Sequence, residues 1–202
     1  MTITDDAFPV PTGLTTPEFV LRPITADDAE NDFAAVMETR ESLRLWEQST
    51  WPEDEFTVEG NRKDLVDMEE RHLAHRAYSY TVLDPGDSQC LGCVYIFPTS
   101  ATFLTRAAVT AVGTESWDHV EAVVYFWVRL SRMATGMDER LLAELRAWMR
   151  SGWGLARVVF VVSEEFGQQL ALFERTDLVQ QFVLVEPHKT GQYRVFGEKR
   201  MP

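Results

Sequence analysis

The sequence predicts a mixed α/β (α+β) domain in which a mostly antiparallel sheet of about seven strands is flanked by about four helices. Three patterns support this fold class. The run ARVVFVV (156–162) is almost continuously apolar, which is typical of a strand covered on both faces, as in a parallel pairing. Residues 141–149 carry apolar side chains at helical spacing, so one stripe of a helix is expected to be buried. Two pairs of strand-like segments, each joined by a turn, predict β-hairpins.

Length and composition indicate one domain. The chain has 202 residues, of which 45% are hydrophobic and 11% aromatic, so it can bury a substantial core. We expect a loose leader over residues 1–17, which is acidic and interrupted by prolines, and a single domain over residues 18–202. The longest apolar runs span about seven residues, whereas a membrane-spanning helix needs about twenty. We therefore expect a cytoplasmic protein without a membrane segment.

A strand and a helix open the domain. FVLRPI (19–24) has the branched and apolar residues of a strand. Thr25 and Asp28 are spaced as a capping box, so a helix is expected to begin there and to run to about Leu45. Residues 46–56, with two tryptophans, a proline and several acids, are expected to form a loop.

A second helix and a hairpin follow. The helix is expected over residues 57–75, with its apolar positions at Val58, Leu65, Met68 and Leu73. YSYTVL (78–83) and CVYIF (93–97), joined by the turn DPGDSQ, are expected to form the first hairpin. Residues 98–116, rich in Thr and Ala, fit either a long loop or a strand extension.

The second half of the chain alternates strands and helices before a final hairpin. HVEAVVYFWV (119–128) is dense in branched and aromatic residues and predicts a strand. The helix that follows is expected to end at SGWG (151–154), ahead of the strand ARVVFVV. The remaining elements are a short helix at GQQLALFER (167–175) and a hairpin of LVQQFVLVE (178–186) and QYRVFG (192–197).

Charge narrows the choice of partners. The formal net charge is -13, from 32 Asp and Glu against 19 Lys and Arg. Such a field repels nucleic acid and anionic lipid, so we expect neither as a partner, and a cationic partner is favoured. The acids are spread along the chain, so they also fit an acidic, solvated surface.

The two cysteines, Cys90 and Cys93, fall in the strand-forming segment CLGCVYIFP. Three positions apart on a regular strand, their side chains are expected on opposite faces, which disfavours a redox pair or a zinc site. Zinc would need two further ligands, for which His72 and His75 are the candidates. We therefore expect no metal and two packed thiols.

The element order resembles that of the GNAT superfamily of acyl-CoA-dependent N-acyltransferases over roughly residues 18–198. An LRP strand opens the domain, and WVR (127–129) leads through a glycine-bearing turn into a helix at its centre. The resemblance implies a sheet splayed between the fourth and fifth strands, with acyl-CoA in the gap and its pyrophosphate on backbone N–H groups of that turn. It therefore implies acetyl-CoA or another acyl-CoA as co-substrate.

The family signature for this turn, Q/R-x-x-G-x-G/A, falls on MATGMD (133–138), where Gly136 alone matches. Thr135 and Asp138 are spaced as a capping box, and Asp138 with Glu139 complements the helix dipole. Two interpretations stay open: a turn that chiefly caps the helix and binds CoA weakly or not at all, or a turn that holds CoA with Asp138 turned away. The residues expected beside the co-substrate are Trp127, Val128, Met133, Ala134, Thr135, Gly136, Met137, Asp138 and Phe173.

Two further family positions differ in this chain. The tyrosine that often protonates the departing thiolate falls on Phe173, and the asparagine that often follows the fifth strand falls on Phe166. A phenyl ring cannot give a proton, so the resemblance leaves this chain without that general acid.

A candidate general base lies on the strand 119–128. Glu121 and Tyr125 share one face of that strand because side chains alternate with a period of two. The resemblance places Glu121 near the base that takes a proton, commonly through water, from the substrate amine, although Glu121 also fits an exposed acid at a strand end. Tyr125 lies about 13 Å from Glu121 at roughly 3.3 Å per residue, and also fits a core position.

The acceptor side is expected at the first helix and its loop. Trp46 and Trp51 with neighbouring acids suit a cationic amine through cation–π and charge attraction, and they also fit packing under a solvated loop. Ser163 and Glu164 follow the strand 156–162 at the gap. The candidate substrate residues are Trp46, Trp51, Tyr125, Ser163 and Glu164.

Two functions follow from these patterns. The first is an N-acetyltransferase that moves an acyl group from acyl-CoA to a cationic amine on a small molecule or peptide. The second is a protein of the same fold without acyl transfer, acting as a binding or self-associating module. Assembly into a homodimer is left open by the sequence.

Overall fold

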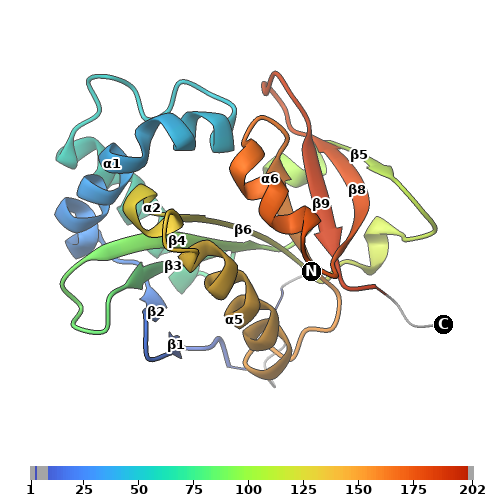
Figure 1. Cartoon of the computed structure of the whole chain (residues 1–202), viewed down its shortest axis with the longest axis horizontal. Coiled ribbons are helices and arrows are strands. Elements are labelled where there is room, and N and C mark those ends of the chain that lie inside the picture. The colour runs from blue at the N-terminus through green and yellow to red at the C-terminus, as the bar shows by residue number, and fades with distance from the viewer. Residues whose placement is uncertain (1–2, 4–8, 200–202) are drawn as a thin grey trace.

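Nine strands form one sheet in the part of the chain that the structure describes, residues 3 and 9–199 (Figure 1). The structure is a computed structural model. Across the sheet the strands are β1 (Leu14–Thr15), β2 (Val20–Pro23), β3 (Tyr78–Leu83), β4 (Cys90–Phe97), β6 (Ala122–Val128), β7 (Val158–Ser163), β9 (Tyr193–Gly197), β8 (Val179–Val185) and β5 (Ala108–Ala111). All neighbours pair antiparallel except β6 and β7, which are parallel. The predicted mixed, mostly antiparallel sheet is confirmed.

Helices cover both faces of the sheet. They are α1 (Ala29–Glu47), α2 (Val58–Leu73), α3 (Thr102–Thr105), α4 (Leu130–Met133), α5 (Met137–Ser151) and α6 (Gly167–Glu174), with the 3₁₀ turns η1 (Ala26–Asp28) and η2 (Trp117–His119). α1 and α2 pack on one face, whereas α5 and α6 pack on the other, where Figure 1 shows them in front of the sheet. None of the described helices is long and apolar enough to cross a membrane.

The buried stripe predicted over residues 141–149 is confirmed in α5. Leu141, Leu145 and Trp148 are at most 5% exposed and belong to the core between α5, α6 and the sheet. Burial of side chains of this size stabilises the fold by about 1.5–3 kcal/mol each. α2 has no such apolar stripe, because Asn61 and His72 share its buried face with Leu65. Leu73 was expected on that face, and this was wrong: it lies one position past His72 and is 75% exposed.

The predicted capping box at the start of the first helix is confirmed. Thr25 N donates to Asp28 Oδ2 at 2.9 Å, and η1 leads directly into α1. Arg22 of β2 clamps the same carboxylate with Nη1 at 2.9 Å and Nη2 at 2.7 Å. The Arg22 guanidinium and the hydrogen bonds from Thr25 hold the pKa of Asp28 below its ordinary value although burial opposes them. The arginine of the LRP segment thus ties β2 to the start of α1.

Two further strands are present, one in the expected leader and one in residues 98–116, for which a strand extension was one of the two expectations. β1 falls within the expected leader and pairs with β2. The chain just before β1 is also held, because the Tyr80 hydroxyl donates to Pro11 O at 2.7 Å. Residues 1–2 and 4–8 of that leader lie outside the described part. β5 falls within residues 98–116 and pairs with β8 at the sheet edge, mostly exposed. Both strands are short edge strands, so neither carries the buried alternation that identifies a strand in sequence.

A β-bulge overturns the expectation for the two cysteines. Leu83 of β3 pairs with Cys90, but Val82 pairs with Gly92, so Leu91 is an extra residue in β4. The bulge consumes one residue of the alternation, and Cys90 and Cys93 therefore point to the same face instead of opposite faces. The sulfurs of both cysteines lie near Asp32 of α1.

Candidate active site

The sheet splays where the two parallel strands separate. β6 and β7 pair through Ala122–Val124 and Val158–Phe160, and residues 125–128 and 161–163 continue unpaired with one another. We call the space between these two segments the gap. The splay expected between the two central strands is therefore present, and its apex lies at Tyr125 on β6.

Side chains from both faces of the sheet close the gap. Phe126 O accepts a hydrogen bond from Trp46 Nε1 of α1 at 3.0 Å and another from Gln169 Nε2 of α6 at 2.9 Å. Both side chains are buried, and Gln169 Oε1 has no hydrogen-bond partner among the described residues. A buried carbonyl oxygen left unpaired costs about 1–3 kcal/mol. Gln169 therefore presents an unused acceptor inside the gap.

The turn before α5 begins the helix differently from the prediction. Gly136, with φ 72°, is the N-cap, and Asp138 becomes the second residue of the helix. A capping box between Thr135 and Asp138 requires Thr135 at the N-cap, so this prediction was wrong. The Thr135 hydroxyl donates instead to Arg132 O at 2.7 Å. Glycine is suited to the N-cap here because its φ is left-handed.

The Asp138 carboxylate lies on the end of α5 that faces α6. Asp138 Oδ1 accepts from Glu139 N at 3.0 Å, and Oδ2 accepts from Gln168 Nε2 of α6 at 2.5 Å. Asp138 is 5% exposed, so it is not turned out into solvent. A second carboxylate, Glu38, accepts from Ser131 N at 3.0 Å. The chain's own acids thus use one N–H group on either side of the turn 133–138, where an anionic ligand would meet their negative charge.

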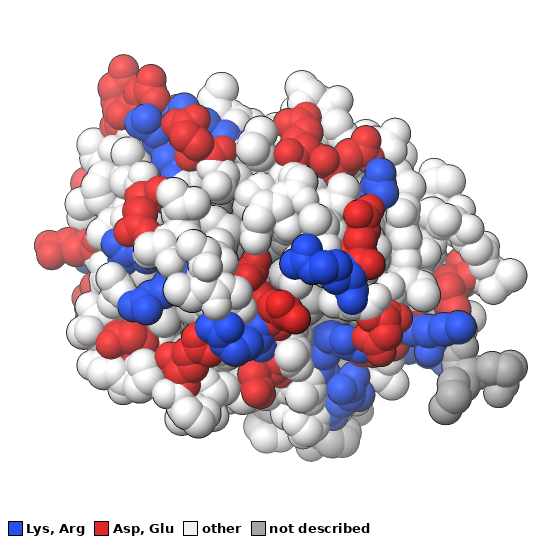
Figure 2. Space-filling view, viewed as in Figure 1, with Lys and Arg blue, Asp and Glu red and all other residues white. Residues whose placement is uncertain are grey.

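Two of the cations near this turn are already paired with acids. Arg140 clamps Glu18 with two bonds of 2.6 Å, and its Nη1 donates to Thr135 O at 3.0 Å. Arg129 donates to Glu38 at 2.6 Å. Figure 2 shows basic and acidic side chains interleaved over the face that carries α5 and α6. An anion at the turn would compete with these carboxylates for the same guanidinium groups.

On the α1 side of the apex, a tyrosine meets a half-buried acid. Tyr125 Oη donates to Glu186 Oε1 at 2.6 Å, and Glu186 follows directly after β8. Burial raises the pKa of Glu186, and the negative charge of Glu47 acts in the same direction, while the hydrogen bond from Tyr125 opposes them. A carboxylate with a raised pKa is suited to take a proton near neutral pH.

The end of α1 beside Glu186 already holds an ammonium group. Lys189 Nζ, from the turn between β8 and β9, donates to Glu47 O at 2.6 Å and also to the Glu47 carboxylate. Tyr193 Oη donates to the same carbonyl at 2.9 Å. The C-terminus of a helix carries a partial negative charge, so Glu47, Glu186 and the last carbonyls of α1 together form a site for a cation. We call this the ammonium site.

The other predicted acceptor residues have different surroundings. Ser163 Oγ donates to Leu45 O at 2.6 Å and joins α1 to β7. Glu164 is exposed and lies 3.8 Å from the Arg194 guanidinium. Trp51 packs edge-on against Phe56 with ring centroids 5.8 Å apart, whereas Trp46 packs against Tyr125. The structure therefore brings Trp46 and Tyr125 together at the apex and leaves Trp51 and Glu164 outside it.

Glu121 lies at the opposite end of β6 from the gap. Its Oε2 accepts from Ala156 N at 2.9 Å and from Arg157 N at 2.7 Å, so it fastens the entry of β7. It precedes β6, on the side where β6 and β7 are still paired. This geometry does not support a role for Glu121 as the base at the gap.

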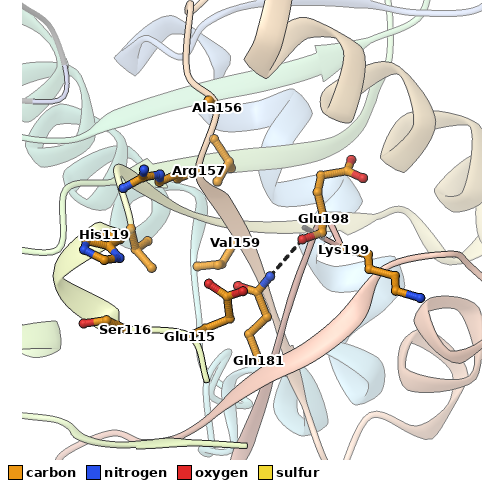
Figure 3. A pocket seen from close by; sticks show the side chains of 11 residues that line it. Glu115, Ser116, His119, Ala156, Arg157, Val159, Gln181, Glu198 and Lys199 are labelled. Carbon is orange, nitrogen blue, oxygen red and sulfur yellow. Dashed lines mark hydrogen bonds between the residues drawn. The ribbon is translucent and has the colours of Figure 1, made fainter. Parts of the chain in front are cut away.

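A cavity of about 180 Å³ opens near that same end of the sheet (Figure 3). Its wall includes His119, Arg157 and Lys199, together with Gln181, whose Nε2 donates to Glu198 O at 3.0 Å. The cavity lies beside the start of β7 and not beside residues 161–163. It therefore does not mark the gap.

Phe173 occupies an apolar core and does not reach the ammonium site. It is fully buried, with ring centroids 6.1 Å from Phe126, 6.2 Å from Phe160 and 5.3 Å from Phe196. A hydroxyl at the para position would enter this aromatic cluster without a partner. A tyrosine at position 173 could therefore act as an acid only if the gap had a different arrangement.

We expect Phe173→Tyr to lower the free energy of unfolding by about 1–3 kcal/mol, because it buries an unsatisfied hydroxyl. Urea unfolding followed by fluorescence measures this change. Phe56→Tyr is the matched control, since Phe56 is partly exposed and its hydroxyl can reach water. Equal stability of Phe173→Tyr and the unmodified protein would show that the gap relaxes to accept the hydroxyl.

The splayed sheet, the turn before α5 and the helix arrangement together define the class: the chain has the fold of the GNAT superfamily of N-acetyltransferases. Among curated proteins it is similar to the probable N-acetyltransferase YjcK of Bacillus subtilis (strain 168), at 24% identity over 150 residues that cover 68% of this chain and 82% of that protein. No protein-family model matches the sequence.

Solved structures agree on the fold. The ribosomal-protein-S5-alanine acetyltransferase of Vibrio fischeri superposes with a TM-score of 0.65 at 17% identity, covering 91% of this chain and 94% of that one. The microcin C7 self-immunity acetyltransferase MccE, solved with acetyl-CoA and AMP, gives a TM-score of 0.66 at 13% identity, covering 95% of this chain and 98% of that one. At these identities the likeness concerns the fold.

Sequence reasoning missed three residues of this region. Glu186 and Lys189 belong to a hairpin turn in which charged residues are ordinary, and no local pattern marks them. Gln169 lies in a short helix as one of two adjacent glutamines. Each becomes notable through a contact with a distant segment, namely Tyr125, Glu47 or the Phe126 carbonyl.

Proposed function

We propose that this protein transfers an acyl group, in the first instance acetyl, from acyl-CoA to a primary amine that carries a positive charge. The GNAT fold and the weak similarity to an N-acetyltransferase support acyl transfer in general. The acceptor class rests on the ammonium site of this chain.

The observation that carries the proposal is the position of Lys189. Its ammonium group is bound by Glu47 at the C-terminus of α1, next to the Tyr125–Glu186 pair at the apex of the splay. An acceptor ammonium that displaces Lys189 finds the same carbonyl and carboxylate partners. Trp46, which packs edge-on against Tyr125, supplies an aromatic wall for such a cation.

The chemistry that these groups support is a direct transfer. Glu186 takes a proton from the acceptor ammonium, and the freed nitrogen lone pair attacks the thioester carbonyl carbon. The tetrahedral intermediate then expels the thiolate as the C–S bond breaks, and the new amide nitrogen loses its second proton to solvent. Because no acid is placed at Phe173, the departing thiolate takes its proton from water.

The gap has partners for the amide-bearing arm of the co-substrate. Gln169 Oε1 is a buried acceptor without a donor, and the Phe126 carbonyl is its neighbour. An amide N–H brought into the gap would satisfy Gln169 Oε1, which is the feature that fits acyl-CoA. For this, the Trp46 indole N–H would have to release Phe126 O, and the Asp138–Gln168 bond between α5 and α6 would have to open.

The closed gap also favours a second function, a binding or self-associating module without acyl transfer. In that case the hydrogen bonds to Phe126 O and the Asp138–Gln168 bond are permanent parts of the core. The two functions differ in whether acetyl-CoA binds at all.

We expect acetyl-CoA to bind in a calorimetric titration, and its thiol to be released only when an amine is added. The acceptor panel contains polyamines, basic peptides and peptides with a free N-terminal alanine; the last are included because the Vibrio fischeri neighbour is an S5-alanine acetyltransferase. Absence of binding at about millimolar ligand, which corresponds to a free energy weaker than about -4 kcal/mol, would favour the second function.

A further inference from the structure

Three side chains that could bind a metal converge away from the gap. The Asp32 carboxylate of α1 and the thiols of Cys90 and Cys93 of β4 place their ligand atoms within 4.8 Å of one another, and all three residues are buried. The β-bulge at Leu91 is what brings the two cysteines to this side of the sheet. The bulge thus turns both thiols toward the same carboxylate.

The two distances between sulfur and oxygen are close to the edge of a tetrahedral zinc site. Asp32 Oδ1 lies 3.2 Å from Cys93 Sγ and 3.8 Å from Cys90 Sγ. With Zn–S bonds of about 2.3 Å and Zn–O bonds of about 2.0 Å, a tetrahedral centre separates sulfur from oxygen by about 3.5 Å. The two observed sulfur–oxygen distances lie on either side of this value.

The Asp32 carboxylate is oriented as a one-oxygen ligand. Asn61 Nδ2 of α2 donates to Asp32 Oδ2 at 2.9 Å and to Ala29 O at 3.0 Å, and Asn61 is itself buried. This fixed amide holds Oδ2 and leaves Oδ1 facing the two sulfurs. Ligands of structural metals are commonly oriented by such hydrogen bonds from outside the coordination sphere.

No positively charged side chain in the described part of the chain is paired with Asp32. Burial raises the pKa of Asp32 and of the Cys93 thiol. A divalent cation would offset the negative charge of the carboxylate and the thiolates that bind it.

Two hydroxyl groups lie beside the open coordination position. Thr81 Oγ1 of β3 is 3.7 Å from Cys90 Sγ and is fully buried. Tyr95 of β4 interacts with the Cys93 thiol. A water held by these hydroxyl groups can supply the fourth ligand.

We propose that Asp32, Cys90 and Cys93 form a structural zinc site that links α1 to β4. Two thiolates with one carboxylate suit the borderline-soft Zn²⁺ ion better than Mg²⁺ or Ca²⁺. The site is enclosed, so the ion binds as the chain folds and is expected to exchange slowly. It lies between α1 and β4, and its presence does not depend on acyl transfer.

The test measures metal in the full-length protein. After expression with added zinc and dialysis against metal-free buffer, elemental analysis is expected to find about one zinc per chain. Cys93→Ser and Asp32→Asn are expected to lower that content at least about tenfold, because each removes a ligand. Val94→Ala is the matched control: Val94 is buried on the opposite face of β4, so this variant loses core volume and keeps the zinc.

Cobalt keeps the test decisive if a ligand variant fails to fold. Refolding the unmodified protein with Co²⁺ is expected to give thiolate-to-cobalt absorption in the near ultraviolet and tetrahedral bands in the visible, and Zn²⁺ is expected to raise Tm. The proposal is overturned by metal-free protein with no cobalt spectrum, by zinc content equal in Cys93→Ser and the unmodified protein, or by a mass two hydrogens lower that reveals a Cys90–Cys93 disulfide.

Discussion

Glu186→Gln is expected to lower kcat/KM for acyl transfer by about 10²–10⁴-fold, the contribution of a positioned general base. Glutamine keeps the size of the side chain and can still accept from Tyr125, but it cannot take the proton of the acceptor ammonium. Acetyl-CoA affinity should stay the same, because Glu186 lies on the α1 side of the sheet, away from the turn before α5. Thiol release measured against amine concentration, together with calorimetry, separates the two effects.

Two further variants sharpen this experiment. Glu174→Gln removes an exposed carboxylate that pairs with Arg194, and activity should be retained. Glu121→Gln tests the base suggested by the sequence, and its structural bonds to the start of β7 predict a stability effect instead of a catalytic one. If Glu121→Gln abolished turnover in a folded protein while Glu186→Gln did not, the assignment made from the structure would be wrong.

The pH profile provides a second test of Glu186. Glu186 acts as a base when it is ionised. Burial and the negative charge of Glu47 raise the pKa of Glu186, whereas the hydrogen bond from Tyr125 and the charge of Lys189 lower it. Burial raises the pKa of Tyr193, so this hydroxyl stays neutral in the same pH range. The rate is therefore expected to fall as pH drops through a pKa above that of an ordinary carboxyl group. In Glu186→Gln this limb of the profile should disappear. A limb that persists unchanged in the variant would belong to another group.

Asp138→Asn is expected to tighten CoA binding by about tenfold or more. A carboxylate about 4 Å from a phosphate repels it by roughly 1 kcal/mol in water and about 4 kcal/mol at an effective dielectric constant near 20, and about 1.4 kcal/mol changes affinity tenfold. Asparagine keeps the shape, and its amide oxygen can still accept from Glu139 N. Its Nδ2 can only donate, so the Gln168 amide has to turn over and present its oxygen to keep the contact between α5 and α6. The helix itself should lose about 0.3–1 kcal/mol, because the charge no longer complements the dipole.

Glu139→Gln is the matched control for Asp138→Asn. It removes a charge from the same first turn, but Glu139 is exposed, whereas Asp138 bonds to α6. Calorimetric titration with CoA should therefore show a smaller gain for Glu139→Gln. Identical affinities in Asp138→Asn and the unmodified protein would mean that the pyrophosphate does not approach this carboxylate.

Much of the fold follows from patterns within single segments. The helical stripe of α5, the apolar run of β7 and the capping box of Thr25 and Asp28 each depend on neighbours less than about ten residues apart, and the structure confirms all three. The element order they give was enough to predict the GNAT-like sheet. The same patterns gave no indication of β1 and left residues 98–116, which contain β5, as either a loop or a strand extension, since short edge strands bury too little to impose an alternation.

The groups that could perform chemistry depend instead on contacts between distant segments. Tyr125 meets Glu186 across 61 positions of the chain, and Lys189 meets Glu47 across 142. Burial changes the chemistry of Glu186 through the loss of solvent around it, and no property of its sequence neighbours encodes that loss. Likewise, one extra residue in β4 reversed the expected orientation of Cys90 relative to Cys93. Local periodicity thus specified the helices and central strands, whereas the packing of α1 and the β8–β9 turn around the splay decided which side chains share a site.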